Sequence, residues 1–160
     1  MLMLFRNFAL LVLSLATVPA FAKGDPVPLD LNQPRDKVMV QIERIKSDLR
    51  GGEVYSEIAL DQRSKVEQAL DRILVRIESN GDAGTLPAQQ EAVTFNDQEI
   101  VNTILTKARE DSRIVCRREK TVGSHRVTSN CITVAERKRL RDKGEQDMTD
   151  MQRRFKALNP

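Results

Sequence analysis

Two cysteines, Cys116 and Cys131, and the dipeptide Gly123-Ser124 between them constrain the fold more than any other feature of the sequence. Glycine at the first central position suits a two-residue type II′ turn, which joins two antiparallel strands. Six residues lie between each cysteine and this turn, so the two cysteines face each other across the ladder without adjustment. Opposed Cα atoms lie ~4.5–5.5 Å apart, a separation that a disulfide can span. The sequence therefore predicts a disulfide-closed β-hairpin at about 113–132.

Side chains alternate between the two faces of a strand, so the basic residues of this hairpin divide between them. Neither face is apolar enough for full burial, and we expect the ribbon to project with its cysteine face leaning on a helix. Arginine can bind carboxylates or phosphates through two parallel hydrogen bonds, which makes the hairpin a candidate binding surface. A solvated basic face is the alternative. The candidate binding residues are Arg117, Arg118, Lys120, His125 and Arg126 in the hairpin, with Arg137 and Arg139 after it.

The spacing of the cysteines disfavours a redox or metal-binding role. The chain has no Cys-x-x-Cys motif, and a zinc site made of Cys116, Cys131 and His125 lacks a fourth ligand. His125 is also the single histidine, and we find no phosphate loop and no apolar setting for a carboxylate pair. We therefore expect no catalytic residue, no metal and no cofactor.

The N-terminus predicts export. Arg6 supplies a positive charge, residues 8–18 form an apolar run, and Ala20-Phe21-Ala22 is a small-x-small cleavage site. The run is too short to span a bilayer comfortably. We expect cleavage after Ala22 and a periplasmic or secreted mature chain without a stable membrane anchor; an uncleaved N-terminal anchor is the alternative. In such an oxidising compartment, two cysteines favour a structural disulfide.

The spacing of apolar residues predicts a mainly α domain: an antiparallel helical hairpin and further helices around the disulfide-closed β-hairpin. Prolines and few apolar residues predict a flexible leader at 23–34, followed by one domain over 35–160. The first helix is expected to start near Arg35 and to end at Gly51-Gly52, the turn of the helical hairpin. Further helices are expected at 56–79, 97–112 and from 134 to about 155.

Two capping boxes mark the expected starts of the later helices. Asn96 and Glu99 form the first pair, and Thr133 and Glu136 form the second. The last helix has few apolar residues and contains Gly144. We therefore expect its second half to fray or to depend on a partner, and its continuity stays open at this stage.

Charge is unevenly distributed along the chain. Residues 23–106 carry 10 basic and 15 acidic side chains, whereas residues 107–143 carry 12 basic and 5 acidic ones. Such asymmetry indicates an anionic partner for the basic half, or two halves that face each other within a monomer or across a dimer. Export and the lack of interleaved aromatic residues make nucleic acid an unlikely partner.

The segment from Ile114 to Glu136 resembles a motif of small, exported, largely uncharacterised proteins of proteobacteria. Their pattern is Cys-Arg-Arg-Glu, then a Gly-Ser turn, then Cys and Thr that lead into a helix. This segment covers about a seventh of the chain, and its matching residues are Cys116, Arg117, Arg118, Glu119, Gly123, Ser124, Cys131 and Thr133. The resemblance implies export and the disulfide, and it carries no activity.

These observations predict an exported, non-catalytic binding or accessory protein that acts through the basic hairpin. Its partner would be a protein or an anionic component of the cell envelope, and a homodimer through the helices is possible. The alternatives are an envelope hydrolase that uses carboxylates and a binder of anionic polymers or nucleic acid.

Overall fold

The structure is a computed structural model, which describes residues 28–120, 122–123 and 125–158. The predicted signal peptide and its cleavage site lie outside these residues. Most of the described chain is helical, with one two-stranded antiparallel sheet, which confirms the predicted mainly α class. In chain order the elements are α1 (Arg35–Gly51), α2 (Leu60–Asn80), a short 3₁₀ helix η1 (Ala83–Thr85), α3 (Ala88–Ser112), β1 (Ile114–Lys120), β2 (Val127–Thr133) and α4 (Val134–Leu158).

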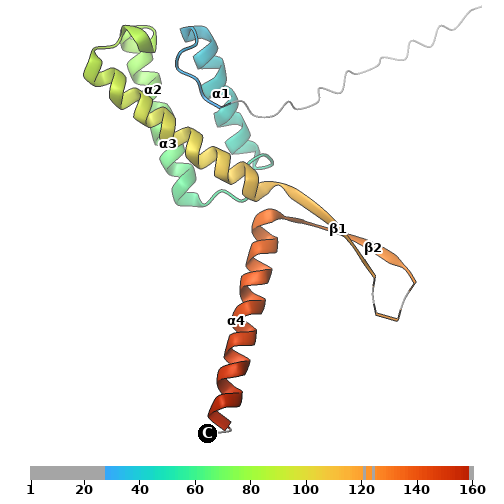
Figure 1. Cartoon of the computed structure of the whole chain (residues 1–160). Helices are drawn as coiled ribbons and strands as arrows, with labels where there is room; N and C mark the ends of the chain where they lie inside the picture. Colours follow the sequence, from blue (N-terminus) through green and yellow to red (C-terminus); the bar gives the residue numbers. More distant parts are fainter. Residues whose placement is uncertain (1–27, 121, 124, 159–160) are drawn as a thin grey trace, which may run out of the picture.

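Helices α1, α2 and α3 lie together and form the body of the molecule (Figure 1). The apolar residues of α1 and α2, whose spacing predicted these helices, are buried in the core, and α3 supplies the remaining helical residues of the core. Apart from Tyr55, the buried core is aliphatic, as suits a sequence poor in aromatic residues. Its buried helical residues are Val38, Ile42, Ile45 and Leu49 of α1, Val66, Ala69, Leu70, Ile73 and Ile77 of α2, and Val101, Leu105 and Ala108 of α3.

The connection between α1 and α2 is longer than predicted. Gly52 follows α1 with a φ of +68°, a left-handed conformation that glycine adopts without the steric cost of a Cβ. Helix α2 begins at Leu60 and not at Ser56, because the intervening loop turns back to the core through Tyr55, which is 4% exposed. The helical hairpin is therefore present, but a packed loop joins its helices instead of a tight Gly-Gly turn.

Helix α3 begins at Ala88, so the capping box predicted at Asn96 and Glu99 is wrong. Pro87 precedes the helix, and its carbonyl accepts a hydrogen bond from the N–H of Glu91 at 2.9 Å. Thr94 and Asp97 occupy buried positions in the first half of α3. Because these buried residues are polar, the apolar periodicity of the sequence does not reveal the first half of the helix.

Asp97 joins α2 to α3 through a buried ion pair. Its carboxylate accepts hydrogen bonds from Arg72 at 2.6 Å and from Arg76 at 2.7 Å, and its side chain is 4% exposed. Burial alone would raise the pKa of Asp97, but the hydrogen bonds and charges of the two arginines hold it below its usual value. The carboxylate therefore stays ionised inside the body.

Residues 28–34 pack on the body, so the predicted flexible leader is wrong for this part; residues 23–27 lie outside the described chain. Leu29 and Leu31 are 1% and 2% exposed. The N–H of Leu29 donates to Asn102 and that of Leu31 donates to Gln98, each at 2.8 Å. Side-chain amides of α3 thus satisfy backbone N–H groups of a segment that belongs to no helix or strand.

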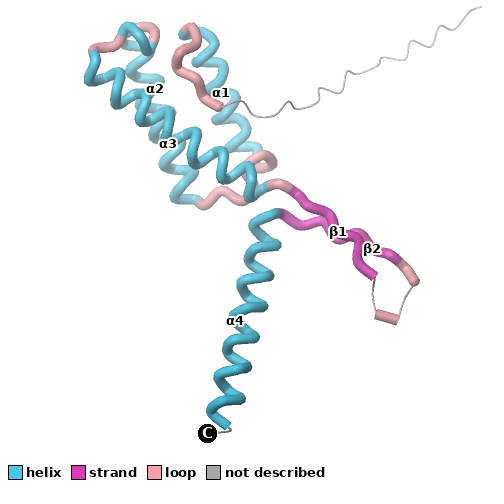
Figure 2. Tube along the Cα trace, viewed as in Figure 1, coloured by secondary structure: helices cyan, strands magenta, loops and turns pink. Residues whose placement is uncertain are grey.

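The hairpin of β1 and β2 and the helix α4 both leave the body, in different directions (Figure 2). Helix α4 runs without a break through Gly144, which settles its continuity. Of its 25 residues, none is buried. The body, the hairpin and α4 therefore meet at one joint, around the end of α3 and the start of α4.

Candidate binding surface

The strand pairing confirms the register predicted from the sequence. Cys116 faces Cys131 with their Cα atoms 4.0 Å apart, and a disulfide joins them. The ladder continues outward to the pair of Lys120 and Val127. Gly123 has a φ of +82°, as the first central position of a type II′ turn requires, whereas Ser124 lies outside the described residues. Turn and disulfide thus hold the hairpin in a single register.

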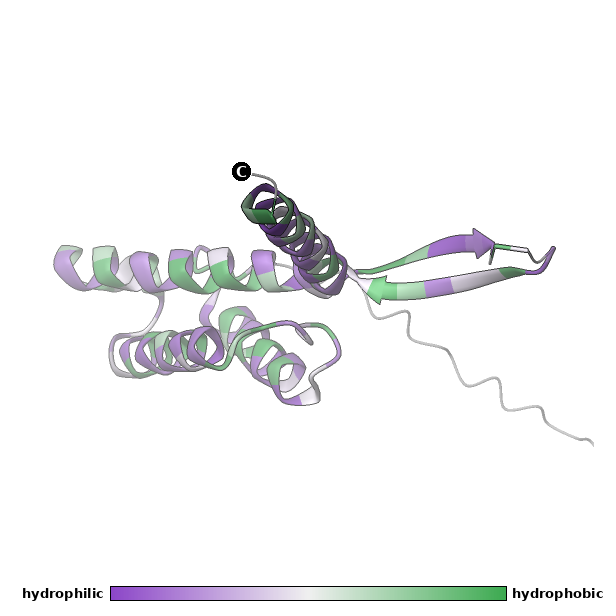
Figure 3. Cartoon of the chain, turned by 90° about the horizontal axis from the view of Figure 1, so that it is seen from below, coloured by the Kyte–Doolittle hydropathy of each residue, from purple (hydrophilic) through white to green (hydrophobic). Residues whose placement is uncertain are grey.

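Two basic side chains stand together on the cysteine face of the hairpin. Arg118 is paired with Ser129 and Lys120 with Val127, and these four residues line a shallow open hollow. The outer half of β1 is hydrophilic, whereas the base of the hairpin is apolar (Figure 3). The positive charge therefore lies far from the body, where a partner can reach it.

The cysteine face does not lean on a helix, contrary to the prediction. Both cysteines are exposed, and every residue of β1 beyond Val115 is exposed. Val115 and its partner Ile132 are half-buried instead, at the base of the hairpin next to α4. Contact with the helices is thus limited to the base, because the outer part extends beyond them.

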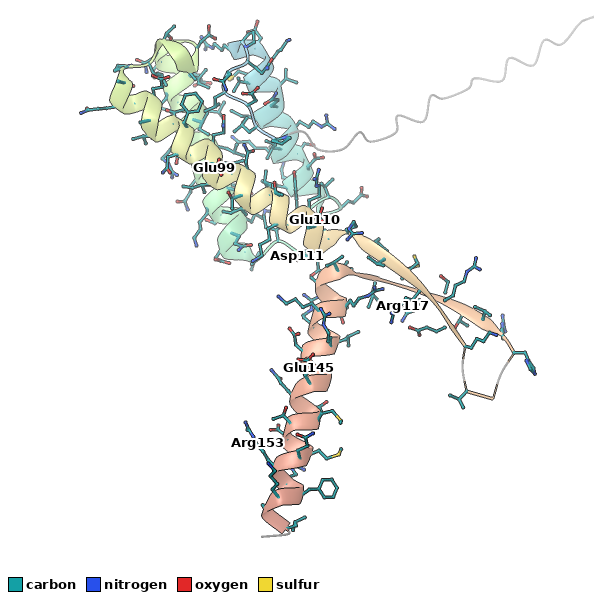
Figure 4. All side chains as sticks on the ribbon, in the orientation of Figure 1. Glu99, Glu110, Asp111, Arg117, Glu145 and Arg153 are labelled. Atoms are coloured by element: carbon teal, nitrogen blue, oxygen red, sulfur yellow. A yellow bond between two sulfur atoms is a disulfide. The ribbon has the colours of Figure 1, made fainter. Side chains whose placement is uncertain are left out.

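The other predicted residues of the hairpin lie apart from Arg118 and Lys120. Arg117 is on the opposite face, paired with Asn130 (Figure 4). His125 and Arg126 precede the first paired residue of β2 and are exposed. The predicted set of basic residues is therefore divided between two faces and the tip.

Arg137 and Arg139 hold α4 in place and do not extend the hairpin surface. Arg137 donates from Nη2 to the carbonyl oxygen of Val115 at 3.3 Å, which ties the first turns of α4 to β1. Arg139 binds Glu136 within its own helix at 2.7 Å and Glu57 of the body at 2.9 Å. Both guanidinium groups are thus engaged at the joint.

Glu57, in the loop before α2, is the centre of this joint. Its Oε1 accepts a hydrogen bond from the Thr133 hydroxyl at 2.7 Å, while its Oε2 binds Arg139. Its N–H donates to the Ser112 hydroxyl at 2.9 Å. Thr133 also accepts the N–H of Glu136 at 3.0 Å, which confirms it as the cap of α4.

The contacts of Glu57 change its titration. Hydrogen bonds from Arg139 and Thr133 hold the pKa of the Glu57 carboxyl below its usual value. The same pairing raises the pKa of Arg139. Sequence reasoning did not select Glu57, because one acidic residue in a loop carries no pattern. Its partners are 76 and 82 positions away along the chain.

Among the described residues, no group of three or more histidine, cysteine, aspartate or glutamate side chains is arranged to hold a metal ion. A small cavity of about 70 Å³ lies between Tyr55, Asn102 and Arg109, but Asn102 is engaged with Leu29 there. No helix in the described chain is both long and apolar enough to cross a membrane. The exposed basic side chains of Arg118 and Lys120 make the projecting hairpin the candidate binding surface.

Comparison with known proteins does not add to this geometry. No protein family, curated protein or solved structure matches the chain. The disulfide is typical of proteins that fold in an oxidising, exported environment.

Proposed function

We propose that this chain is an exported, non-catalytic binding or accessory protein of the bacterial periplasm that acts through the cysteine face of its disulfide-closed hairpin. The observation that carries the proposal is the pair Arg118 and Lys120, held side by side on an exposed face by a covalently closed ladder. A ligand that met this face would find two basic residues whose backbone positions are already set. Its binding would then not have to order the ribbon as well.

The chemistry of the pair favours an anionic partner. Arg118 can bind a carboxylate or a phosphate through two donors, and Lys120 adds a second positive charge on the same face. Val127, 48% exposed in the same hollow, offers apolar contact. A protein with an acidic patch, or an anionic component of the envelope, fits this combination.

The experiment uses the mature chain as bait in an extract of cell envelope, beside two double variants. Arg118→Ala with Lys120→Ala removes the charges of the cysteine face. Arg117→Ala with Arg126→Ala removes the same charge from the opposite face and the tip, and it is the matched control. We expect the first variant to lose a partner that the wild type and the control both retain. Raising the salt from 50 to about 300 mM should weaken that capture steeply.

Several results would contradict the proposal. If both variants captured the partner equally, the site would lie outside the cysteine face. If capture did not weaken as the salt concentration rises, charge would be excluded as its cause. Turnover of peptidoglycan by the purified chain, lost on changing one carboxylate, would favour an envelope hydrolase instead.

A further inference from the structure

Helix α4 carries an apolar stripe that no other described element covers. Its five large apolar side chains are between 53% and 76% exposed. With Gly144 among them, the stripe positions are separated by three or four residues, so they lie along one face of the helix. The stripe consists of Leu140, Gly144, Met148, Met151, Phe155 and Leu158.

We infer that α4 pairs in an antiparallel manner with α4 of a second copy of this chain. The stripe is nearly symmetric about its midpoint, between Met148 and Met151. When two copies overlap fully in opposite directions, each residue of one half faces a residue of the other half. The facing pairs are Met148 with Met151, Gly144 with Phe155, and Leu140 with Leu158.

Gly144 supports this register. An added Cβ at Gly144 would meet no atom within 4 Å, so nothing in the described part of the chain requires a glycine there. Glycine inside a helix costs about 1 kcal/mol relative to alanine. In the antiparallel pair Gly144 faces Phe155 of the second copy, where the missing side chain leaves room for the aromatic ring. The pairing thus explains both the glycine and the exposed phenylalanine.

Charges beside the stripe favour the same direction. Asp147 and Arg154 are seven residues apart and flank the stripe on one side. In the antiparallel pair, Asp147 of each copy lies next to Arg154 of the other, and the two-fold symmetry makes this contact twice. A parallel pair in register would instead place each basic residue at the start of α4 beside the same basic residue of the second copy, so that like charges would meet.

The shape of the molecule also permits this arrangement. Helix α4 starts at the joint and its other end lies far from the body (Figure 1), so antiparallel pairing keeps the two bodies at opposite ends. Leu140 lies six residues, or about 9 Å, beyond the start of α4, which separates the stripe from the body. Arg153 lies on the polar face of α4, with Glu145 and Asp150, and stays in solvent (Figure 4).

The first test measures the mass of the mature chain by sedimentation equilibrium up to about 100 µM, a range that detects micromolar association. We expect a dimer. Met148→Glu places a charge on the stripe and should weaken the dimer at least a hundredfold. Gln146→Glu adds the same charge to the opposite face of the same helix, and it should leave the dimer unchanged.

The second test addresses direction. Asp147→Arg alone and Arg154→Asp alone each place like charges side by side across the antiparallel pair, and each should weaken the dimer several-fold. The double variant again places opposite charges side by side between the two copies. It does not restore contacts within one helix, because positions 147 and 154 have different neighbours one turn away. Recovery of wild-type dimer affinity by the double variant is the expected result.

A monomeric wild type, or a dimer that Met148→Glu leaves intact, would overturn the inference. A double variant that dimerises as weakly as the single variants would overturn the antiparallel register. If a monomeric chain lost an envelope partner on Met148→Glu, the stripe would belong to that partner. The Arg118→Ala, Lys120→Ala variant should remain a dimer, so failure of the proposed function and failure of this inference are distinguishable.

Discussion

Single polar residues hold the helices of this protein in place where apolar periodicity is interrupted. Asp97 is the clearest case, since its ion pairs with Arg72 and Arg76 join α2 to α3 from a buried position. Ser112 donates to the Ala108 carbonyl and accepts the N–H of Glu57, so one buried hydroxyl links the end of α3 to the loop before α2. The body is therefore specified by a few buried polar contacts as well as by its aliphatic core.

Asp97→Asn should lower the free energy of unfolding by about 2–3 kcal/mol, because it leaves two arginines without their charged acceptor at a buried position. Urea unfolding followed by circular dichroism measures the change. Asp71→Asn is the matched control. Its ion pair with Lys46 is made by an aspartate that is 65% exposed, and its loss should cost less than about 1 kcal/mol. Equal costs for the two variants would contradict the role assigned to Asp97.

The stability gained through Asp97 should depend on pH. Its pKa is lower in the folded chain than in the unfolded one, so the unfolded state binds a proton more readily. The contribution is therefore complete above the ordinary aspartate pKa of 3.8 and is lost as the pH falls through the folded pKa. The difference in unfolding free energy between wild type and Asp97→Asn should narrow as the pH falls from 5 to about 2.5. A gap that stayed constant would show that charge is not its cause.

The ends of the elements follow the backbone preferences of particular residues. Gly52 terminates α1 in a left-handed conformation, and Pro87 precedes α3. At the N-terminus of α1, the N–H of Arg35 donates to the Asp82 carboxylate at 2.8 Å, so the loop after α2 caps α1. Local residues thus end the helices, while a cap from a distant loop fixes how they meet.

Gly52→Ala should destabilise the chain by about 1–2 kcal/mol, because alanine pays a steric cost at a φ of +68°. Gly51→Ala is the matched control, one residue earlier, in the last turn of α1. A Cβ at either position would meet nothing within 4 Å, so only the backbone conformation separates the two variants. We expect Gly51→Ala to be neutral or slightly stabilising in thermal unfolding. The same loss at both positions would argue against a conformational cause.

At the scale of the molecule, the described chain consists of a packed body and two projections that share little buried surface with it. The buried apolar residues belong to α1, α2, α3 and the segments that pack on them, whereas the outer hairpin and α4 are exposed. Glu57, Thr133 and Arg139 set the direction in which α4 leaves the body. This division suits a protein that presents surfaces to other molecules and keeps its own stability in the body.

Replacing both cysteines by serine should loosen the hairpin and leave the body folded. The disulfide stabilises the hairpin by about 3 kcal/mol in the chain-entropy account. An isolated two-stranded hairpin is only marginally stable in water, so it should not stay folded without this contribution. We expect amide exchange in β1 and β2 to accelerate strongly. The thermal midpoint of the helical signal should stay close to that of the wild type. Loss of that signal together with the hairpin would show that the disulfide stabilises the body as well.

The register and the disulfide of the hairpin were predictable because their determinants are local. Gly123 and the two cysteines specify one register by counting, and the structure has that register. The stripes of α1 and α2 were predictable for the same reason, since a helical period shows in a window of consecutive residues. The sequence by itself thus determined the class of fold, the disulfide and the apolar faces of these two helices.

Tertiary structure decided the features that depend on partners distant in the chain. The segment at Leu29 and Leu31 looks like a leader until the amides of α3 satisfy its backbone and the core takes up its leucines. Arg139 looks like a binding residue until Glu57, 82 positions away, accepts its guanidinium group. A contact between distant residues leaves no period in the sequence, because it depends on how the helices pack and not on neighbours along the chain.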